Sequence, residues 1–154
     1  PYKDVQTYNE SAKAFTQDGK RSVNITPAQP AFTRPVVVLI DSSTLDAGEG
    51  IVAALKRLPN VRTVGDAATH ASFATTGGGM TLPKGHTVLY PIGRALDEHG
   101  KILLESDREG NGGIAPDVRV ETSQETVQRR FVKNEDVVLE RGQQVLAEMI
   151  AAAQ

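Results

Sequence analysis

The segment between residues 36 and 65 constrains the fold more than any other part of the chain. It opens with Val36 to Ile40, an unbroken run of valine, leucine and isoleucine that is typical of a strand buried on both faces of a sheet. From Gly48 to Leu58 the apolar residues recur with the period of one helical face, and Pro59 ends that pattern. Val61 to Gly65 then has the length and composition of a second strand. Strand, helix and strand in this order predict a parallel βαβ unit.

A β-hairpin, a last strand and a final helix are predicted to complete the fold. Pro83–Gly85 supplies turn chemistry between two short strands, Met80–Leu82 and His86–Tyr90. Val118–Val120 is predicted to be the last strand, and Asn134 to cap the final helix. The apolar stripe of that helix is expected to contain Val138, Val145, Leu146 and Met149.

Two other parts of the chain are predicted to be less regular. Residues 1–34 form a polar lead-in in which only "SVNIT", Ser22–Thr26, has the alternation of a short edge strand, and residues 35–154 hold the main unit. Residues 66–79, "DAATHASFATTGGG", are rich in small side chains and are predicted to be a binding loop. Because the first residue, Pro1, is not methionine, we expect a processed chain or part of a longer one.

Composition narrows the classes of function. The 154 residues, of which 39% are hydrophobic, suffice for one globular core. The net charge is −2 with both signs interspersed, so nucleic acid and anionic membranes are not expected partners, and no segment approaches the length of a membrane span. There is no cysteine and no pair of histidines at metal-ligand spacing. We therefore predict no metal and no cofactor.

The turn "SSTLDAGEG" is the strongest candidate site on physical grounds. Ligands of parallel sheets bind at the carboxyl ends of strands, and the helix that starts there offers unpaired N–H groups and a positive dipole end. Hydroxyl groups and a carboxylate gather at this point: Ser42, Ser43, Thr44 and Asp46. A nucleophilic serine in the first turn of this helix would have the N–H of the next residue available as an oxyanion donor. A competing interpretation is a simple helix start, since Asp46 and Glu49 have the spacing of a capping box.

Several motifs, in order, carry a resemblance to a known family. They are "VVVLIDSSTLDAGEGIVAALKRL", "VRTVGD", "TLPKGHTVLYPIGRALDEHG", "GGIAPDVRV" and "DVVLERGQQVLAEM". From about Ile25 to Met149 the chain resembles the serine peptidases of the C-terminal-processing (tail-specific) and tricorn-core type, specifically the C-terminal part of their catalytic domain. The resemblance implies an α/β fold with a crotonase- and Clp-peptidase-like core. That core has a mostly parallel sheet and flanking helices, to which this chain adds a β-hairpin.

The family's reaction centre transfers to this chain only in part. Its turn "T-x-S-A-G-E" aligns with Thr44 to Glu49 and places Asp46 at the nucleophile position, with Ala47 as the backbone oxyanion donor. A carboxylate at this position is an ineffective acyl acceptor, and its charge would repel a developing oxyanion.

The other catalytic groups of the family are absent or weakly matched. Ala71 or a neighbour stands where the processing branch has its lysine base, and His70 in the same loop is a candidate base. Glu109 lies near the position of the supporting glutamate of the tricorn branch. The family's "D-L-R-x-N-x-G-G" strand, whose glycines complete the oxyanion hole, has no counterpart upstream of Val36.

Three hypotheses follow from the sequence. The first is a segment of a serine-type peptidase for peptide or protein C-terminal processing, inactive as it stands because of Asp46. The second is a noncatalytic peptide-binding or structural module on the same fold, and the third is an acyl-binding role by analogy with crotonases. Expected partners are peptide or protein segments, with self-association or an upstream half of the same domain as further expectations. The resemblance implies an extracytoplasmic location, periplasmic or secreted.

Overall fold

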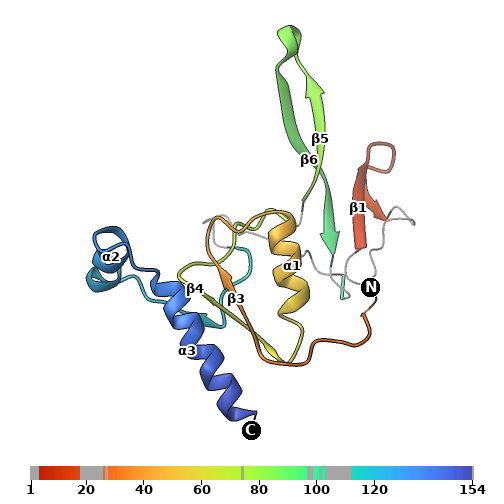
Figure 1. Ribbon diagram of the computed structural model, residues 1–154. Helices are drawn as coiled ribbons and strands as arrows, with labels where there is room; N and C mark the ends of the chain where they lie inside the picture. Colours follow the sequence, from red (N-terminus) through yellow and green to blue (C-terminus); the bar gives the residue numbers. More distant parts are fainter. Residues whose placement is uncertain are drawn as a thin grey trace. The chain divides into compact units, whose positions relative to one another are not determined.

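The computed structural model describes residues 4–17, 26, 28–73, 75–96, 99, 100, 102 and 112–153 (Figure 1). The chain divides into two compact units. One comprises Pro1–Gln29 and Ser72–Glu105, and the other comprises Pro30–Ala71 and Ser106–Gln154. Each unit is described by itself below.

The second unit contains the predicted βαβ arrangement. Strands β3 (Val36–Ile40), β4 (Val61–Gly65) and β7 (Val118–Arg119) form a three-stranded sheet in the order β3-β4-β7, and both neighbouring pairs are parallel. Helix α1 (Ala47–Leu55) connects β3 to β4. The two predicted strands and the parallel crossover between them are confirmed. The prediction succeeded because a continuous apolar run followed by a helical period of apolar residues is compatible with few other folds.

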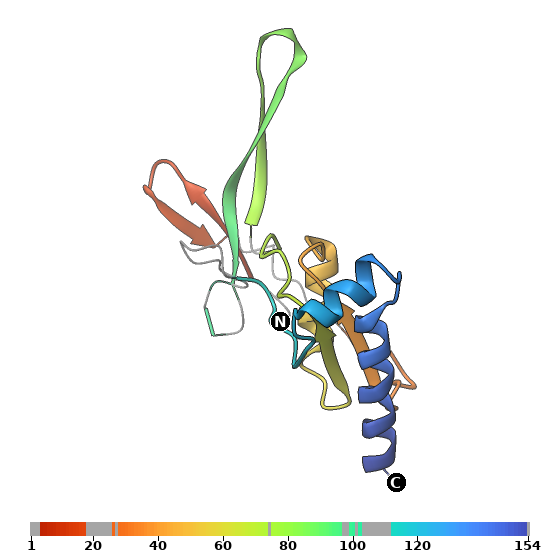
Figure 2. The same ribbon diagram turned by 90° about the vertical axis from the view of Figure 1, so that its left-hand side faces the viewer.

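Two more helices belong to this unit: α2 (Gln124–Phe131) and α3 (Val137–Ala152). Figure 1 shows α1 and α3 on opposite sides of β3 and β4. Helix α3 packs closely on β3, since a Cβ added at Gly142 would lie 2.6 Å from Leu39 Cδ2. Figure 2 shows α2 crossing the start of α3, where Arg129 bonds to Glu135 and Glu140.

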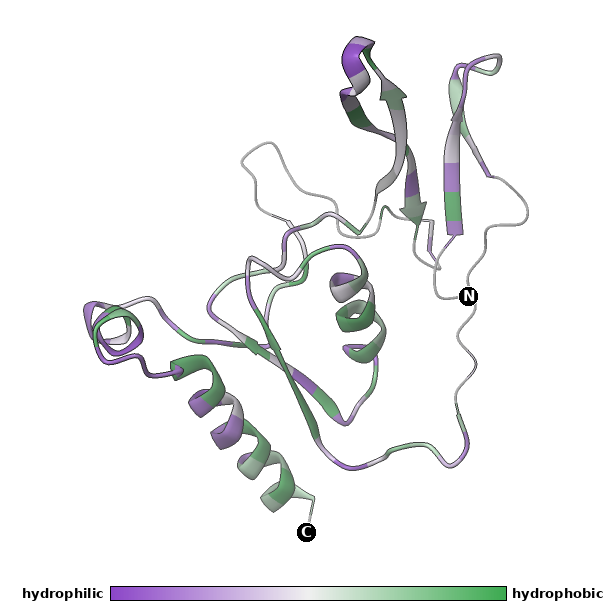
Figure 3. Cartoon of the chain, turned by 45° about the horizontal axis from the view of Figure 1, so that its top comes forward, coloured by the Kyte–Doolittle hydropathy of each residue, from purple (hydrophilic) through white to green (hydrophobic). Residues whose placement is uncertain are grey.

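The core of the second unit is aliphatic. Figure 3 shows β3 and β4 as mainly apolar and α2 as mainly polar. The buried hydrophobic side chains of the second unit are Ile40, Val52, Val61, Val64, Ile114, Val137 and Val145. The strands approach each other very closely at Gly65, where an added Cβ would lie 2.3 Å from the Ile40 carbonyl oxygen. This contact requires glycine at the carboxyl end of β4.

The final helix begins later than predicted. The N-cap is Asp136, whose carboxylate accepts a hydrogen bond from the Leu139 N–H at 2.9 Å. Asn134, the predicted cap, instead adopts a left-handed φ of 57°, a conformation that asparagine tolerates in turns. Of the predicted stripe, Val145 is buried, whereas Val138, Leu146 and Met149 are half-buried.

The first unit is an antiparallel sheet. It has four strands, β1 (Asp4–Asn9), β2 (Ala14–Gln17), β5 (Thr75–Thr81) and β6 (Thr87–Leu96), in the order β2-β1-β6-β5. The predicted hairpin is confirmed, with a 3₁₀ turn at Pro83–Gly85, but its strands are longer than expected.

The expectation of a mostly parallel sheet holds for the second unit only. The four-stranded sheet is antiparallel. In it the hairpin strand β6 pairs with β1, a strand that lies in the part of the chain predicted to be a polar lead-in. Gly77–Gly79, predicted to be loop, lies in β5, since pairing with the apolar β6 outweighs the low strand propensity of glycine. Of the predicted edge strand Ser22–Thr26, residues 22–25 lie outside the described residues.

Candidate functional site

The candidate site lies at the carboxyl ends of β3 and β4. The chain leaves β3 at Asp41, whose carboxylate accepts hydrogen bonds from the Ser43 N–H at 2.9 Å and from the Thr44 hydroxyl at 3.1 Å. The Thr44 hydroxyl in turn accepts from the Asp41 N–H at 3.2 Å. These local bonds shape a tight turn that leads to the start of α1.

Asp46 occupies a strained backbone conformation at the end of this turn. Its φ is 48° and its ψ is −117°. Residues other than glycine rarely have positive φ, and such strain concentrates at functional sites, including the strand-to-helix turn that presents a nucleophilic serine. The Asp46 side chain is exposed. The turn therefore presents the side chain of residue 46 to solvent at the helix start, as a nucleophile turn does.

The predicted capping box between Asp46 and Glu49 is wrong. An N-cap residue normally has an extended backbone, from which its side chain reaches the first helical N–H groups. The positive φ of Asp46 abolishes that geometry, and its side chain accepts no capping hydrogen bond. Glu49 is fully buried, and its Oε1 accepts the backbone N–H of Ala71 at 2.6 Å.

Ala47 is the first residue of α1 and follows Asp46 directly. Its N–H has no acceptor within the helix, because the first four N–H groups of any α-helix lack intrahelical partners. The positive end of the helix dipole adds to the attraction for a negative charge at this point. The role of Ala47 as an oxyanion donor stays a prediction.

The loop after β4 is fastened beside this turn. The His70 N–H donates to the Thr44 carbonyl at 2.9 Å. Thr69, which is buried, accepts from the Ile114 N–H through its Oγ1 at 2.7 Å and donates its own N–H to the Ile114 carbonyl at 3.2 Å. Gly113 makes this contact possible, since its φ is 75° and an added Cβ would lie 2.3 Å from the Thr69 carbonyl oxygen.

The structure brings some of the predicted site residues together. The backbones of His70 and Ala71 lie beside the turn that carries Asp46, and the His70 side chain is exposed. Glu109 lies outside the described residues. The sequence therefore located the turn and its neighbouring loop correctly as adjacent segments, whereas the role of Glu49 was missed because its spacing suggested a cap.

A pocket of about 340 Å³ opens beside the same turn. It is lined by apolar and charged side chains, from Leu39, Ile40, Asp41, Thr44, Asp66, Arg130, Asp136 and Val138. Arg130 and Asp66, which both line the pocket, form an ion pair. Sequence reasoning missed Arg130 because α2 is mostly polar, with only Val127 and Phe131 at helical spacing, although the position of Asp66 directly after β4 was a usable signal.

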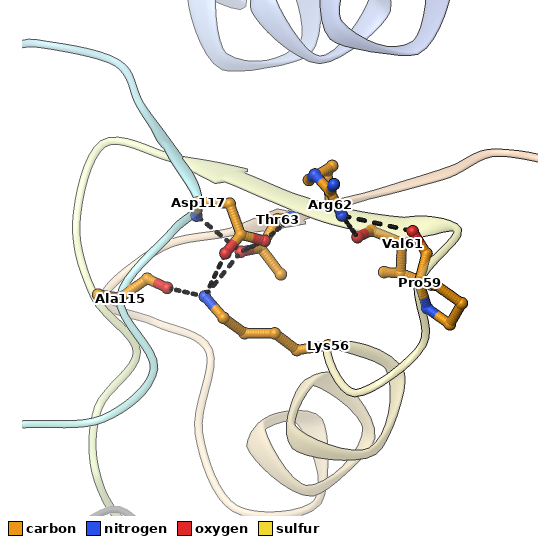
Figure 4. A network of polar contacts seen from close by, with 7 residues as sticks. All are labelled: Lys56, Pro59, Val61, Arg62, Thr63, Ala115 and Asp117. Atoms are coloured by element: carbon orange, nitrogen blue, oxygen red, sulfur yellow. Dashed lines mark hydrogen bonds and ion pairs between the residues drawn. The ribbon is translucent and has the colours of Figure 1, made fainter. Parts of the chain in front are cut away.

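A polar network fixes the opposite end of α1 (Figure 4). Lys56 Nζ lies 2.8 Å from Asp117 Oδ1 and donates to the Ala115 carbonyl at 2.6 Å. Asp117 Oδ2 accepts both the N–H and the hydroxyl of Thr63, at 2.8 and 2.9 Å. Burial opposes ionisation of Asp117, but hydrogen bonds from Lys56 and Thr63 outweigh it and hold the pKa of this carboxyl below its usual value.

Within the described ranges, no group of three or more histidine, cysteine, aspartate or glutamate residues could hold a metal ion. No helix in that part of the chain is both long and apolar enough to cross a membrane.

Comparison with known proteins gives the family. No curated protein matches the chain. A crystal structure of a proposed peptidase from Parabacteroides merdae is similar with a TM-score of 0.66 and 23% identity, over 93% of this chain and 42% of that one. The structure of a lipoprotein from Streptococcus agalactiae gives a TM-score of 0.48 and 16% identity, over 87% of this chain and 45% of that one. This chain spans less than half the length of either structure.

The similarity to the Parabacteroides merdae structure supports the fold. The family is shown by the sequence. The pattern of peptidase family S41 matches residues 2–120, which include both strands of the βαβ unit, the turn at Asp46 and the loop at His70. Membership implies the Clp-peptidase-like fold and a peptidase-like segment. The chain therefore belongs to peptidase family S41.

Proposed function

We propose that this chain is the C-terminal part of the catalytic domain of a serine-type peptidase of the C-terminal-processing or tricorn-core type. We propose further that it does not hydrolyse peptides, because Asp46 replaces the nucleophile. The observation that carries the proposal is the backbone of Asp46, with φ 48° and ψ −117° at the junction of a parallel strand and a helix. A strained turn at this junction is where such folds expose a nucleophile.

The chemistry of aspartate accounts for the proposed loss of activity. Acyl transfer requires a nucleophile whose adduct with the carbonyl can be hydrolysed, and an oxyanion must be stabilised by nearby N–H groups. Asp46 directly precedes Ala47, the first residue of α1, so its carboxylate brings a negative charge to the turn where the oxyanion would form. The architecture favours peptide hydrolysis, whereas the side chain opposes it.

Hydrolysis of a quenched fluorescent peptide library tests this proposal. Wild-type protein and the Asp46→Ala variant should show the same background rate, because neither has a nucleophile. A wild-type rate clearly above that of Asp46→Ala would overturn the proposed inactivity.

A noncatalytic peptide-binding module is the second candidate. It is favoured by the pocket of about 340 Å³ at the carboxyl end of β3, next to the turn that carries Asp46. The Asp46→Ser variant separates the two candidates, because hydrolysis that appears with serine indicates a site that lacks only its nucleophile. Peptide binding to wild type, with no hydrolysis by Asp46→Ser, would favour the module. In both cases peptide or protein segments are the proposed partners, and an extracytoplasmic location remains a proposal from the family.

A further inference from the structure

The distal part of the β5–β6 hairpin is a ribbon of two strands. Strand β1 pairs with the stretch of β6 from Gly93 to Leu96, whereas β5 pairs with β6 as far out as Thr87. Among the described strands, β5 is therefore the only neighbour of residues 87–91, and Figure 1 shows the hairpin extending beyond β1. A hairpin of two strands alone is marginally stable in water, so this ribbon would gain from further contacts.

Exposed apolar side chains cover the distal ribbon, residues 77–91. This stretch of sequence contains one charged residue, Lys84, which lies in the turn. The exposed fraction of Leu89 is 80%. Four more large apolar side chains of the ribbon are exposed: Met80, Leu82, Val88 and Tyr90. Apolar surface gathered in this way is typical of an interaction surface.

The ribbon also carries one edge of the antiparallel sheet. The two edge strands of that sheet are β2 and β5. β2 is only four residues long, and short edge strands resist pairing with other chains. β5 is seven residues long and contains neither a charged residue nor proline, and no strand in the described part of the chain pairs with its outer edge. The edge of β5 is therefore suited to receive a further strand.

Three consecutive glycines lie in β5, and contacts within the hairpin account for one of them. A Cβ added at Gly78 would lie 2.8 Å from Ile92 Cγ2, so a side chain there would collide. A Cβ added at Gly77 meets nothing within 4 Å, and one added at Gly79 lies 3.4 Å from Leu89 Cδ2, an ordinary contact. Neither of these two glycines has a positive φ. Because glycine weakens a strand and often marks the close approach of another backbone, Gly77 and Gly79 point to a neighbour outside this chain.

We infer that the edge of β5 pairs with β5 of a second copy of this chain, antiparallel and across a two-fold axis beside Gly79. A symmetric contact of this kind requires a self-complementary surface. With the axis at Gly79, Met80 of each copy lies opposite Gly78 of the other, so a large side chain meets a position without one. The pairing joins two four-stranded sheets and gives each distal ribbon the third strand that stabilises a hairpin.

The charge of the ribbon favours a second copy over a charged partner. A strongly acidic or basic segment would find one charged side chain, Lys84, on the whole ribbon. Two antiparallel hairpins point in opposite directions, so the Lys84 of one copy lies far from that of the other and no like charges meet. This assembly does not depend on any activity at residue 46.

Sedimentation velocity of the full chain at increasing protein concentration tests the assembly. Wild type should change from monomer to dimer as the concentration rises. Gly79→Lys sets two like charges directly opposite each other at the axis and should raise the dissociation constant at least about tenfold. Gln17→Lys is the matched control, because it adds the same charge at an exposed position of β2, the other edge strand, and should leave the dissociation constant unchanged.

Cysteine cross-linking is a second measurement, which needs no charged variant. The chain has no cysteine. Directly opposite residues of antiparallel strands have Cα atoms about 4.5 to 5.5 Å apart, a separation that a disulfide spans. Under mild oxidation Gly79→Cys should therefore form covalent dimers at least about tenfold faster than Gln17→Cys.

Three results would overturn the inference. They are a wild type that stays monomeric at about 1 mM, equal dissociation constants for Gly79→Lys and Gln17→Lys, and equal cross-linking rates for the two cysteine variants. A monomer in which an added extended peptide protects the β5 amides from hydrogen exchange would also overturn it, and would assign this edge to a peptide strand.

Discussion

At the scale of single residues, Asp46 shows what a sequence pattern can and cannot predict. Asp and Glu three positions apart at the start of an apolar helical pattern have the spacing of a capping box. That spacing carries no information about φ, and at the positive φ of Asp46 the side chain makes no capping hydrogen bond. Position 46 was found by the order of motifs along the chain. The partner of Glu49, Ala71, could not be found, because it lies on a loop whose path depends on tertiary contacts.

Gly113 gives a prediction at this scale. Gly113→Ala combines a positive φ of 75° with a Cβ only 2.3 Å from the Thr69 carbonyl oxygen. Gly85→Ala is the matched control, because Gly85 has a φ of 80° but nothing lies within 4 Å of the added Cβ. The strain alone should cost about 1 kcal/mol in the free energy of unfolding, and the clash at Gly113 about 2 kcal/mol more.

Urea unfolding of the two glycine variants measures this difference. An equal loss of stability in Gly113→Ala and Gly85→Ala would show that the loop at Thr69 relaxes freely. The anchoring of that loop beside the turn would then be much weaker than the contacts between Thr69 and Ile114 indicate.

At the scale of elements, the sequence predicted those whose pattern reflects burial. β3 and β4 are correct at both ends because each is a short apolar run with turn residues around it. The sequence did not predict β1, β2 or α2, because these elements are mostly polar. The two strands are stabilised by pairing with each other, and α2 is stabilised by its cap. Capping of α2 by Ser123 and Thr126 is visible only in the structure, because threonine is not the usual third residue of a capping box.

The network at the end of α1 gives a prediction about pH. The pKa of Asp117 is below its ordinary value of 3.8 in the folded protein, so the unfolded chain binds its proton more readily. The stability contributed by this carboxylate is therefore fully present well above pH 3.8 and is lost as pH falls from there towards the lower folded pKa. Asp117→Asn removes this titration, so the variant should lose less stability on acidification than wild type.

Urea unfolding between about pH 2 and pH 6 follows this effect. Glu148→Gln is the control, because Glu148 pairs with Arg141 on the exposed face of α3 and should contribute little. An acid dependence of Asp117→Asn that equals that of wild type would mean that the bonds from Lys56 and Thr63 do not favour the ionised form.

At the scale of the whole molecule, the family explains why separate motifs meet at one place. The turn after β3, the loop after β4 and the segment that contains Gly113 are far apart in sequence, and hydrogen bonds join them at the carboxyl end of the parallel sheet. The resemblance assigned the turn at Asp46 and the loop at His70 to one reaction centre, whereas the contact of that loop with the segment at Gly113 was not predicted. It could not predict the antiparallel pairing of β1 with β6, which depends on residues outside the quoted motifs.

We propose that residue 46 occupies a position built to activate a nucleophile. The chain has no cysteine, so a single cysteine can report on that position directly. We would measure the pH dependence of alkylation by iodoacetamide for Asp46→Cys and for Ala28→Cys, an exposed site in irregular backbone. We expect a thiol pKa about one unit lower at position 46 than at position 28, because the N–H groups and dipole of α1 favour the thiolate. A pKa at position 46 equal to or above that of the control would contradict it.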